Sequence, residues 1–347
     1  MALAVTYLLE DTPLFGGVKV VLQHANLLHA RGHRVEVVSR GASPRWFDLR
    51  APFRQVPELA ATHLPACDVT VATYWTTIRA ATAAPGREVL HFCQGFEGIY
   101  THNEAQHGEI EEAYREPLPA MVVAPHLATL LETRFGRPSA LVPPPLESHS
   151  RGRPRLGPRR RPRVLVMHPW ENDWKGVATA LEAVRVLRSS GVRCHLVRLS
   201  QWPLGDAERA VLTADEFHCH LEPYQAARLV RGCDLLLAPS WEQEAFGLPV
   251  LEAFAAGVPV VASEISAFRW YAGTAAVLVP AHRPEAFARA ARELLADPRR
   301  WRAARRSGFA IARRFTQARV AGALEAALGW VANGRWRSEP PPRSEWG

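Results

Sequence analysis

The chain has 347 residues, of which 48% are hydrophobic and 22% are charged. At roughly 100–200 residues per domain this length predicts about two domains, and the ordinary composition excludes a disordered chain, a collagen and a small disulfide-stapled protein. The five cysteines are scattered, no basic stretch precedes the apolar first residues, and no apolar run approaches the ~20 residues of a membrane-spanning helix. We therefore expect a reduced, cytoplasmic protein without a signal peptide.

Charge is spread unevenly along the chain. Residues 1–150 carry 12 basic and 15 acidic side chains, whereas residues 151–347 carry 30 and 19. Seven arginines lie between Arg151 and Arg163, and five more lie within residues 299–306. Such patches attract anionic ligands, nucleic acid or lipid surfaces, and a solvated surface in an arginine-rich chain explains them equally well. We expect no nucleic-acid partner, and peripheral contact with an anionic membrane at its inner face is a hypothesis.

The first half opens with a pattern typical of a βαβ unit. Residues 2–8 predict a strand, and a loop with Gly16 and Gly17 follows. Apolar residues at helical spacing then run to a glycine, and residues 34–39 predict a second, valine-rich strand. Because the crossover is a helix, the two strands should be parallel. Further short apolar strands are predicted at 69–73, 89–92 and 121–124.

The second half repeats this alternation after a change in composition. Residues 148–162 are rich in arginine, proline and glycine, which is typical of a linker and ends a first lobe at residues 1–147. Strands and helices then alternate over 163–315. We expect the helix near 317–332 to pack back on the first lobe and the proline-containing tail, 333–347, to fray.

Strand–helix alternation in both halves predicts an α/β fold with two Rossmann-like, doubly wound lobes. Ligands of such sheets bind outside the carboxyl ends of the strands, so two lobes that face each other would form a cleft there. A dinucleotide-dependent oxidoreductase would need Gly-x-Gly-x-x-Gly after the first strand. The segment from Phe15 to Lys19 reads Phe-Gly-Gly-Val-Lys and does not supply it.

The segment 239–262 carries the strongest chemical signal. It follows an apolar strand and predicts a loop, a helix, a tight turn and a strand. Pro249 suits the first turn of a helix, and Gly247 lets the backbone approach a ligand. The helix start is a ready anion site, and Glu244 and Glu252 can both point at its mouth. Amides for a diphosphate and carboxylates for hydroxyls together suit a sugar nucleotide.

This Glu-x₇-Glu pair in its loop-helix context closely resembles the signature of retaining glycosyltransferases of family 4, which have the GT-B fold. The resemblance implies that Glu252 holds the ribose hydroxyls and that Glu244 sits by the hydroxyls of the donor sugar. Lys175, one of only two lysines, matches the family's Lys-Gly pair that binds the donor diphosphate. The other donor-binding residues implied are Gly16, Gly17, His168, Ser240, Ala245, Phe246, Gly247 and Leu248.

Two departures from the family pattern change the expected site. Many members carry an Arg five or six residues before the Lys, where this chain has Pro169 and Trp170. We expect His168, or an Arg from elsewhere, to replace that cation. Many members also place a His after a strand of the first lobe, and Gln94 occupies the comparable place here. Gln can bind a sugar but cannot take a proton; Gln94, Glu244 and Lys175 form the predicted catalytic set.

The activity implied is transfer of a sugar from a nucleotide-sugar donor to a glycan, lipid-linked or small-molecule acceptor, with retention at the anomeric carbon. The first lobe would bind the acceptor and the second the donor. Cations and amides would stabilise the leaving diphosphate. Since the chain has no Asp-x-Asp, we expect no metal and no other cofactor. The alternatives are a non-catalytic nucleotide-sugar binding protein of the same fold and a GT-B nucleotide-sugar epimerase.

Two other groups of residues carry weaker signals. The segment 218–220 reads His-Cys-His, but without a second cluster a zinc site is not expected. Residues 74–76 read Tyr-Trp-Thr just after a strand. Their aromatic rings could stack on an acceptor, although packing in the core or at its rim is the commoner role of such rings.

Overall fold

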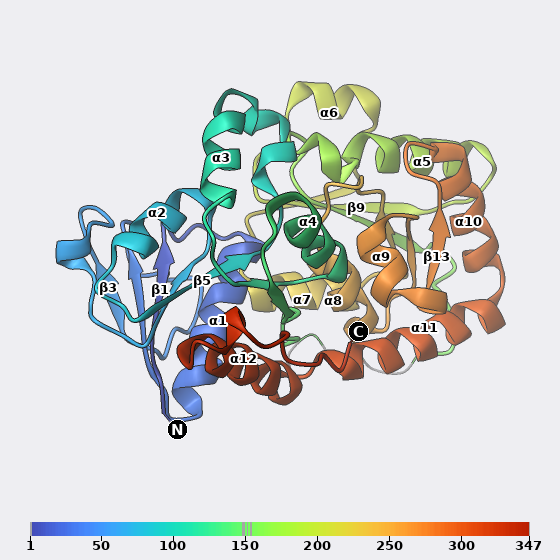
Figure 1. The fold of residues 1–347 in the computed structure, drawn as a ribbon. Coiled ribbons are helices and arrows are strands. Elements are labelled where there is room, and N and C mark those ends of the chain that lie inside the picture. Colours follow the sequence, from blue (N-terminus) through green and yellow to red (C-terminus); the bar gives the residue numbers. More distant parts are fainter. Residues whose placement is uncertain (1, 148–149, 151, 153–154, 347) are drawn as a thin grey trace. The chain divides into compact units, whose positions relative to one another are not determined.

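The computed structural model describes the chain except for residues 1, 148–149, 151, 153–154 and 347. The chain forms two compact units. Unit 1 combines residues 1–145 with 317–347, and unit 2 consists of residues 146–316. Each contains one parallel sheet with helices, so the predicted pair of doubly wound α/β lobes is confirmed (Figure 1).

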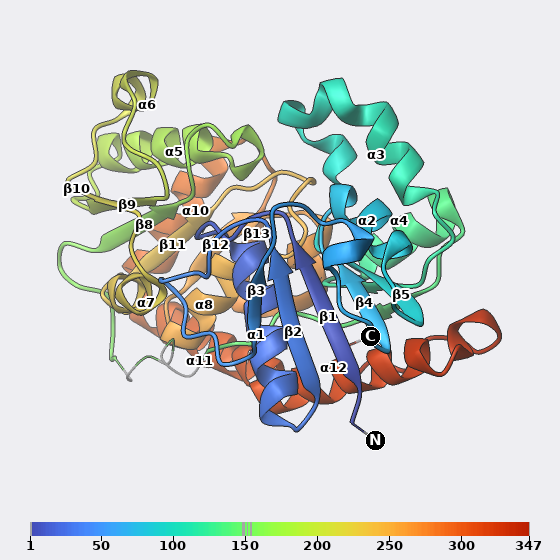
Figure 2. The ribbon, with the colours of Figure 1, turned by 90° about the vertical axis from the view of Figure 1, so that its left-hand side faces the viewer.

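Unit 1 is built on a seven-stranded sheet in the order β3-β2-β1-β4-β5-β6-β7, in which every pairing is parallel. Figure 2 shows β1, β2 and β3 of this sheet from the front. The strands are β1 (Ala4–Leu9), β2 (Arg34–Ser39), β3 (Phe53–Gln55), β4 (Val69–Ala72), β5 (Glu88–Cys93), β6 (Ala120–Val122) and β7 (Ser139–Leu141). The helices are α1 (Gly16–Ala30), α2 (Trp75–Ala83), α3 (His107–Tyr114), α4 (Pro125–Phe135) and α12 (Gln317–Ala332).

Unit 2 is built on a six-stranded parallel sheet in the order β10-β9-β8-β11-β12-β13. The strands are β8 (Arg163–Met167), β9 (His195–Ser200), β10 (Glu216–Cys219), β11 (Leu235–Ala238), β12 (Val260–Ser263) and β13 (Ala276–Val279). The helices are α5 (Val177–Ser189), α6 (Asp206–Val211), α7 (Pro223–Arg231), α8 (Leu248–Ala256), α9 (Ser266–Tyr271), α10 (Pro284–Ala296) and α11 (Pro298–Ala312).

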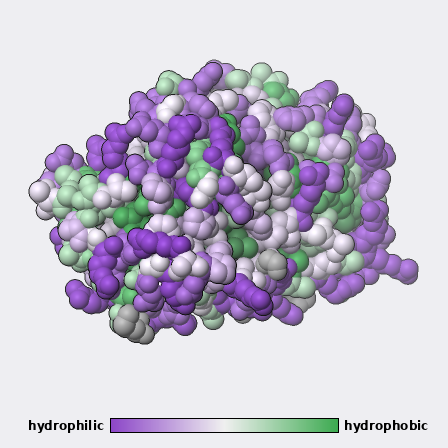
Figure 3. All heavy atoms as spheres, viewed as in Figure 1, coloured by the Kyte–Doolittle hydropathy of each residue, from purple (hydrophilic) through white to green (hydrophobic). Residues whose placement is uncertain are grey.

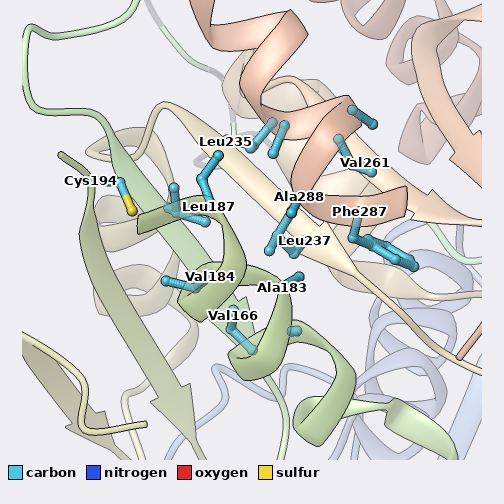
Figure 4. Packing of buried hydrophobic residues seen from close by; sticks show 14 of the residues in the cluster. Val166, Ala183, Val184, Leu187, Cys194, Leu235, Leu237, Val261, Phe287 and Ala288 are labelled. Carbon is cyan, nitrogen blue, oxygen red and sulfur yellow. The ribbon is translucent and has the colours of Figure 1, made fainter. Parts of the chain in front are cut away.

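The core of unit 2 lies between its sheet and the helices α5 and α10 (Figure 4). Leu187 of α5, Leu237 of β11 and Phe287 of α10 belong to one cluster of buried apolar side chains. The central strands β11 and β12 are buried along their whole length, as expected for parallel strands covered on both faces. The face seen in Figure 3 is mostly hydrophilic, with small hydrophobic patches.

Both sheets contain a point where the strand order reverses direction. In unit 1 it lies between β1 and β4, and in unit 2 between β8 and β11. Open α/β sheets bind ligands outside the carboxyl ends of the strands at this switch point. The loops that follow β8 and β11 therefore mark the expected binding position of unit 2.

The predicted linker is not a separate segment in its described part. Unit 2 begins at Leu146, and the buried carboxylate of Asp234 binds the guanidinium groups of Arg155 and Arg159. The same carboxylate also accepts the backbone N–H of Arg163, at the start of β8, at 2.8 Å. Arginines that suggested a solvated stretch therefore attach it to the end of the sheet.

The C-terminal residues belong to unit 1. Helix α12 contacts α1, β4 and β5, and Arg31 makes two hydrogen bonds of 2.7 Å with the carboxylate of Glu325. The expectation that the tail frays is wrong for residues 335–337, which form a 3₁₀ turn. Trp336 and Arg337 both donate to the carboxylate of Glu88 on β5. No helix in the described part of the chain is long and apolar enough to cross a bilayer.

Candidate functional site

The switch point of unit 2 holds a buried ion pair. Lys175, from the loop after β8, donates from Nζ to Oε2 of Glu244 at 2.7 Å. Ser240, from the loop after β11, donates to the same oxygen at 3.1 Å. The side chains of Lys175 and Glu244 are 16% and 7% exposed. Three of the predicted site residues, drawn from two loops that are far apart in the sequence, therefore meet where the topology predicts a ligand.

The two loops meet because the sequence allows a close backbone approach. Gly176 has a φ of +66°, and a Cβ there would lie 2.2 Å from the carbonyl oxygen of Pro239. Only glycine fits this position. The backbone N–H of Trp241 then donates to the carbonyl of Trp174 at 2.7 Å, which ties the loops together. Lys175 is thereby placed directly against the loop that carries Glu244.

Glu244 is ionised despite its burial. Burial alone raises the pKa of its carboxyl group, but the charge of Lys175 and the hydrogen bonds from Lys175 and Ser240 outweigh it and lower the pKa to about 2. Lys175 can still interact with a ligand, because an ammonium group has three donors and Glu244 takes one. The site thus combines a fixed carboxylate with a partly engaged cation.

His168 does not supply the missing second cation. Burial, followed by the neighbouring charge of Lys175, lowers the pKa of its imidazole to about 3. The ring is therefore neutral near pH 7, so His168 can contribute a hydrogen bond but no charge. The expectation that His168 replaces the absent arginine as a cation is not supported by this environment.

An arginine that no sequence motif indicated stabilises the backbone at the end of β8. Arg198 on β9 is fully buried and donates to Glu208 at 2.6 Å. It also donates to the carbonyl oxygens of Val166 and His168, both at 3.0 Å. Since these carbonyls lie at the end of β8, Arg198 stabilises the backbone where His168 has a φ of +88°. An arginine flanked by Val197 and Leu199 in a short strand was the available signal.

The loop from Ala245 to Leu248 leads directly into α8. Gly247 is the N-cap and has a φ of +78°, and Pro249 lies in the first turn. The first amides of a helix lack intrahelical partners, and the helix dipole adds positive potential there. Glu252 lies one turn into α8 and is half-buried. This part of unit 2 can therefore present amides to a phosphate and a carboxylate to hydroxyl groups.

The remaining predicted site residues lie together in unit 1. Gly16 and Gly17 begin α1, and Gln94 follows β5. Gln94 donates from Nε2 to the carbonyl oxygen of Gly17 at 3.1 Å, and a Cβ on Gly17 would lie 3.3 Å from that nitrogen. The structure thus joins the glycine pair to Gln94, a connection that no motif in the sequence indicated.

A buried acid beside Gln94 was also missed. Glu97 is 6% exposed, and its Oε2 lies 2.5 Å from the hydroxyl of Tyr114. That hydroxyl also lies 2.8 Å from the carbonyl oxygen of Gly95. One hydroxyl proton cannot serve both acceptors, so a protonated Glu97 that donates to Tyr114 satisfies all three groups. Burial raises the pKa of the Glu97 carboxyl group to about 7.

The two segments with weaker sequence signals, 74–76 and 218–220, have different surroundings in the structure. Thr76 donates to the carboxylate of Glu10 at the switch point of unit 1, and Tyr74 beside it is half-buried. On β10, His218 lies 2.6 Å from the carboxylate of Glu216, and His195 on the neighbouring strand β9 lies 3.2 Å from the same carboxylate. Among the described residues no three His, Cys, Asp or Glu side chains are grouped as metal ligands.

A model of a known protein family matches part of unit 2. Residues 161–297 match the family model described as Glycosyl transferases group 1. This segment contains the switch point with Lys175 and Glu244 and the whole of α8. The segment that resembles the glycosyltransferase signature and the segment that matches the family model therefore lie in the same region of the chain.

The matches to individual proteins differ in extent. A GDP-mannose-dependent alpha-(1-6)-phosphatidylinositol dimannoside mannosyltransferase of Mycobacterium tuberculosis is 32% identical over 156 residues, which is 44% of this chain and 40% of that protein. The chain thus matches about two fifths of the length of this curated relative.

Solved structures match over nearly the whole chain. HepE of Anabaena, solved in complex with UDP-glucose, has a TM-score of 0.76 at 13% identity and covers 94% of this chain and 99% of its own. Sucrose-phosphate synthase of Thermosynechococcus elongatus has a TM-score of 0.72 at 15% identity, covering 97% and 100%. The fold is GT-B.

Proposed function

We propose that the chain is a glycosyltransferase that moves a sugar from a nucleotide-sugar donor to an acceptor hydroxyl, with retention of the anomeric configuration. The observation that supports it best is the Lys175–Glu244–Ser240 cluster at the switch point of unit 2, next to the start of α8. The family match over residues 161–297 supports the same class of activity.

Different residues of unit 2 bind different parts of the donor in this proposal. Lys175 and the first amides of α8 bind the diphosphate, where negative charge develops as the sugar leaves. Glu244, ionised at any pH above about 2, accepts hydrogen bonds from the hydroxyls of the donor sugar. Glu252 accepts those of the ribose. The ammonium group and the helix amides take the place that a divalent metal has in other transferases, so we propose that the reaction needs no metal.

Unit 1 binds the acceptor in this proposal. Gln94 and the turn at Gly17 supply hydrogen bonds to the acceptor, but an amide cannot take the acceptor proton. The leaving phosphate accepts that proton instead. The mycobacterial relative acts on a phosphatidylinositol dimannoside, so a lipid-linked acceptor, a glycan and a small molecule are the acceptor classes to test. A cytoplasmic enzyme with salt-sensitive, peripheral contact to anionic membranes would fit the first class.

Thermal shift with nucleotides tests the donor site. UDP, GDP, ADP and dTDP and their sugars are added to the wild type, to Glu252→Ala and to Glu285→Ala, an exposed glutamate on α10 as matched control. A ligand that binds only the folded state raises the melting temperature. We expect a rise with one nucleotide in the wild type and in Glu285→Ala, and its loss in Glu252→Ala. No rise with any nucleotide would refute donor binding.

Turnover then separates the enzyme from its alternatives. A transferase releases nucleoside diphosphate only when acceptor is present, an epimerase changes the donor without acceptor, and a binding protein does neither. The anomeric configuration of the product by NMR tests retention, and unchanged turnover in EDTA tests independence from metal. Flotation with anionic vesicles at low and high salt tests the membrane contact.

A further inference from the structure

The helix α9 contacts the proposed donor-binding loop at both of its ends. At the first end, the backbone N–H of Ser266 donates to Oε1 of Glu242 at 3.0 Å. At the second, the hydroxyl of Tyr271 donates to the carbonyl oxygen of Gly247 at 3.1 Å. Glu242 and Gly247 bracket Glu244 and the amides that lead into α8, so one short helix spans the whole loop.

A side chain in the middle of α9 restricts the backbone conformation of the same loop. A Cβ on Gly247 would lie 2.3 Å from the ring of Phe268, and Gly247 already has a φ of +78°. Phe268 is fully buried and cannot move aside easily. The left-handed conformation that turns the loop into α8 is therefore shaped by a side chain of α9 as well as by the glycine itself.

Tyr271 makes two separate contacts with the loop. Its ring stacks on that of Phe246 with centroids 4.8 Å apart and an interplanar angle of 5°. Its hydroxyl is buried and close enough to Glu244 and Glu252 that both carboxylates, after burial itself, raise its pKa. The hydroxyl thus stays protonated and donates to Gly247 throughout the physiological range, while the ring fixes Phe246.

We propose that Tyr271 is a positioning residue for donor binding: through Gly247 and Phe246 it sets the backbone that presents the amides of residues 245–248 to the diphosphate. The inference rests on the proposed function, because it assigns a role to the same loop. The hydroxyl has no substrate contact in this proposal and acts only through the Gly247 carbonyl. Glu242 acts in the same way from the other end of α9.

Tyr271→Phe is the decisive variant, because it removes the hydroxyl and keeps the ring that stacks on Phe246. Tyr224→Phe on α7, whose side chain is 60% exposed, is the matched control. One lost hydrogen bond that restricts a loop predicts a roughly three- to tenfold weaker affinity for the nucleoside diphosphate that binds the wild type best. The donor KM should rise by the same factor, with the acceptor KM unchanged. Glu242→Ala should weaken donor binding in the same direction.

Hydrogen exchange supplies a readout that does not depend on activity. We expect faster exchange of the amides in residues 242–250 of Tyr271→Phe and no change in Tyr224→Phe. A variant with a lower melting temperature but donor affinity within about twofold of the wild type would overturn the inference and leave a purely structural role. Failure of the wild type to bind any of UDP, GDP, ADP or dTDP would instead refute the proposed function and this inference with it.

Discussion

Two buried glutamates, one in each unit, have pKa values shifted in opposite directions. Glu244 in unit 2 and Glu97 in unit 1 are both 6% exposed, and both follow a strand at the carboxyl edge of a parallel sheet. The pKa of Glu244 is lowered to about 2, whereas that of Glu97 is raised to about 7. Burial acts on both carboxyl groups in the same direction, so their partners make the difference.

The partners differ in charge. Glu244 accepts from the ammonium group of Lys175, whereas the described side chain within hydrogen-bond distance of the Glu97 carboxyl is the neutral hydroxyl of Tyr114. A cation at hydrogen-bond distance outweighs the cost of burying a carboxylate, and a hydroxyl does not. Burial at a sheet edge therefore does not by itself identify a charged site; the nearest cation does.

The largest effect should follow from removing that cation. In Lys175→Ala, the carboxylate of Glu244 stays buried without its partner, which costs about 3 kcal/mol of unfolding free energy. Turnover should fall at least about 100-fold, since the positive charge that stabilises the leaving diphosphate is lost. Urea unfolding and initial rates measure the two effects. The double variant Lys175→Met, Glu244→Gln should recover most of the stability and none of the activity; recovered activity would contradict the assignment.

The two glycine turns should respond differently to alanine. Gly247→Ala places a Cβ at a φ of +78° and 2.3 Å from Phe268, so we expect a loss of about 3 kcal/mol and of donor binding. Gly17→Ala places a Cβ 3.3 Å from the movable end of Gln94, so stability should change by less than about 0.5 kcal/mol. Urea unfolding of both variants checks the contrast. Equal losses would mean that the turn in unit 1 is also sterically required.

Glu97→Gln should change how stability depends on pH. The unfolded carboxyl loses its proton near pH 4.5, but the folded one keeps it until about pH 7. Folding therefore weakens as the pH rises from about 4.5 to about 7, by about 3 kcal/mol in total. The amide that the substitution introduces can donate to Tyr114 at every pH and removes this slope. Urea unfolding at about pH 5 and about pH 8 should show the wild type losing stability relative to the variant.

Other groups around Glu97 do not produce the same slope. Burial keeps Tyr114 and Cys93 protonated across this range by raising the pKa of both groups, and Arg137 remains a cation. Burial lowers the pKa of His91 in the folded protein, so this group makes stability rise with pH, opposite to Glu97 and equally in the wild type and the variant. A stability difference between the wild type and the variant that stays constant from about pH 5 to about pH 8 would mean that Glu97 is ionised in the folded protein throughout this range.

The smallest effect is expected at the C-terminal turn. Glu88→Gln removes the charged partner of Arg337, whose side chain is half exposed, and weakens the bond from Trp336. We expect a loss of less than about 1 kcal/mol, because exposed ion pairs are screened by solvent. Urea unfolding in low and in high salt checks it, with Arg209→Ala, which breaks an exposed pair with Asp206, as control.

Local patterns were sufficient to predict the two sheets and the candidate residues. Apolar runs separated by helical periodicity predict parallel strands, and the glycine, proline and glutamates of segment 239–262 predict a phosphate-binding turn. The pairing of Lys175 with Glu244 spans 69 positions and depends on strand order, which periodicity does not encode. Sequence could thus propose both residues but not their contact.

The features that the sequence did not predict share a physical cause. The neutrality of His168 and of Glu97 comes from burial among particular neighbours, and Arg198 and Tyr271 act through backbone carbonyls that no side-chain motif reveals. The linker was misjudged because the acid that binds its arginines, Asp234, lies 75 or more positions away. Each of these depends on burial or on contacts that chain packing creates and that local sequence patterns do not encode.

The return of residues 317–347 to unit 1 has a consequence for the order in which the protein can fold during synthesis. A ribosome completes the continuous residues 146–316 before it makes α12. The sheet of unit 1, although its strands emerge first, therefore waits for the final helix to cover β4 and β5. The unit whose strands are translated first is therefore completed last, and a nascent chain that ends before residue 317 lacks the helix that contacts β4 and β5.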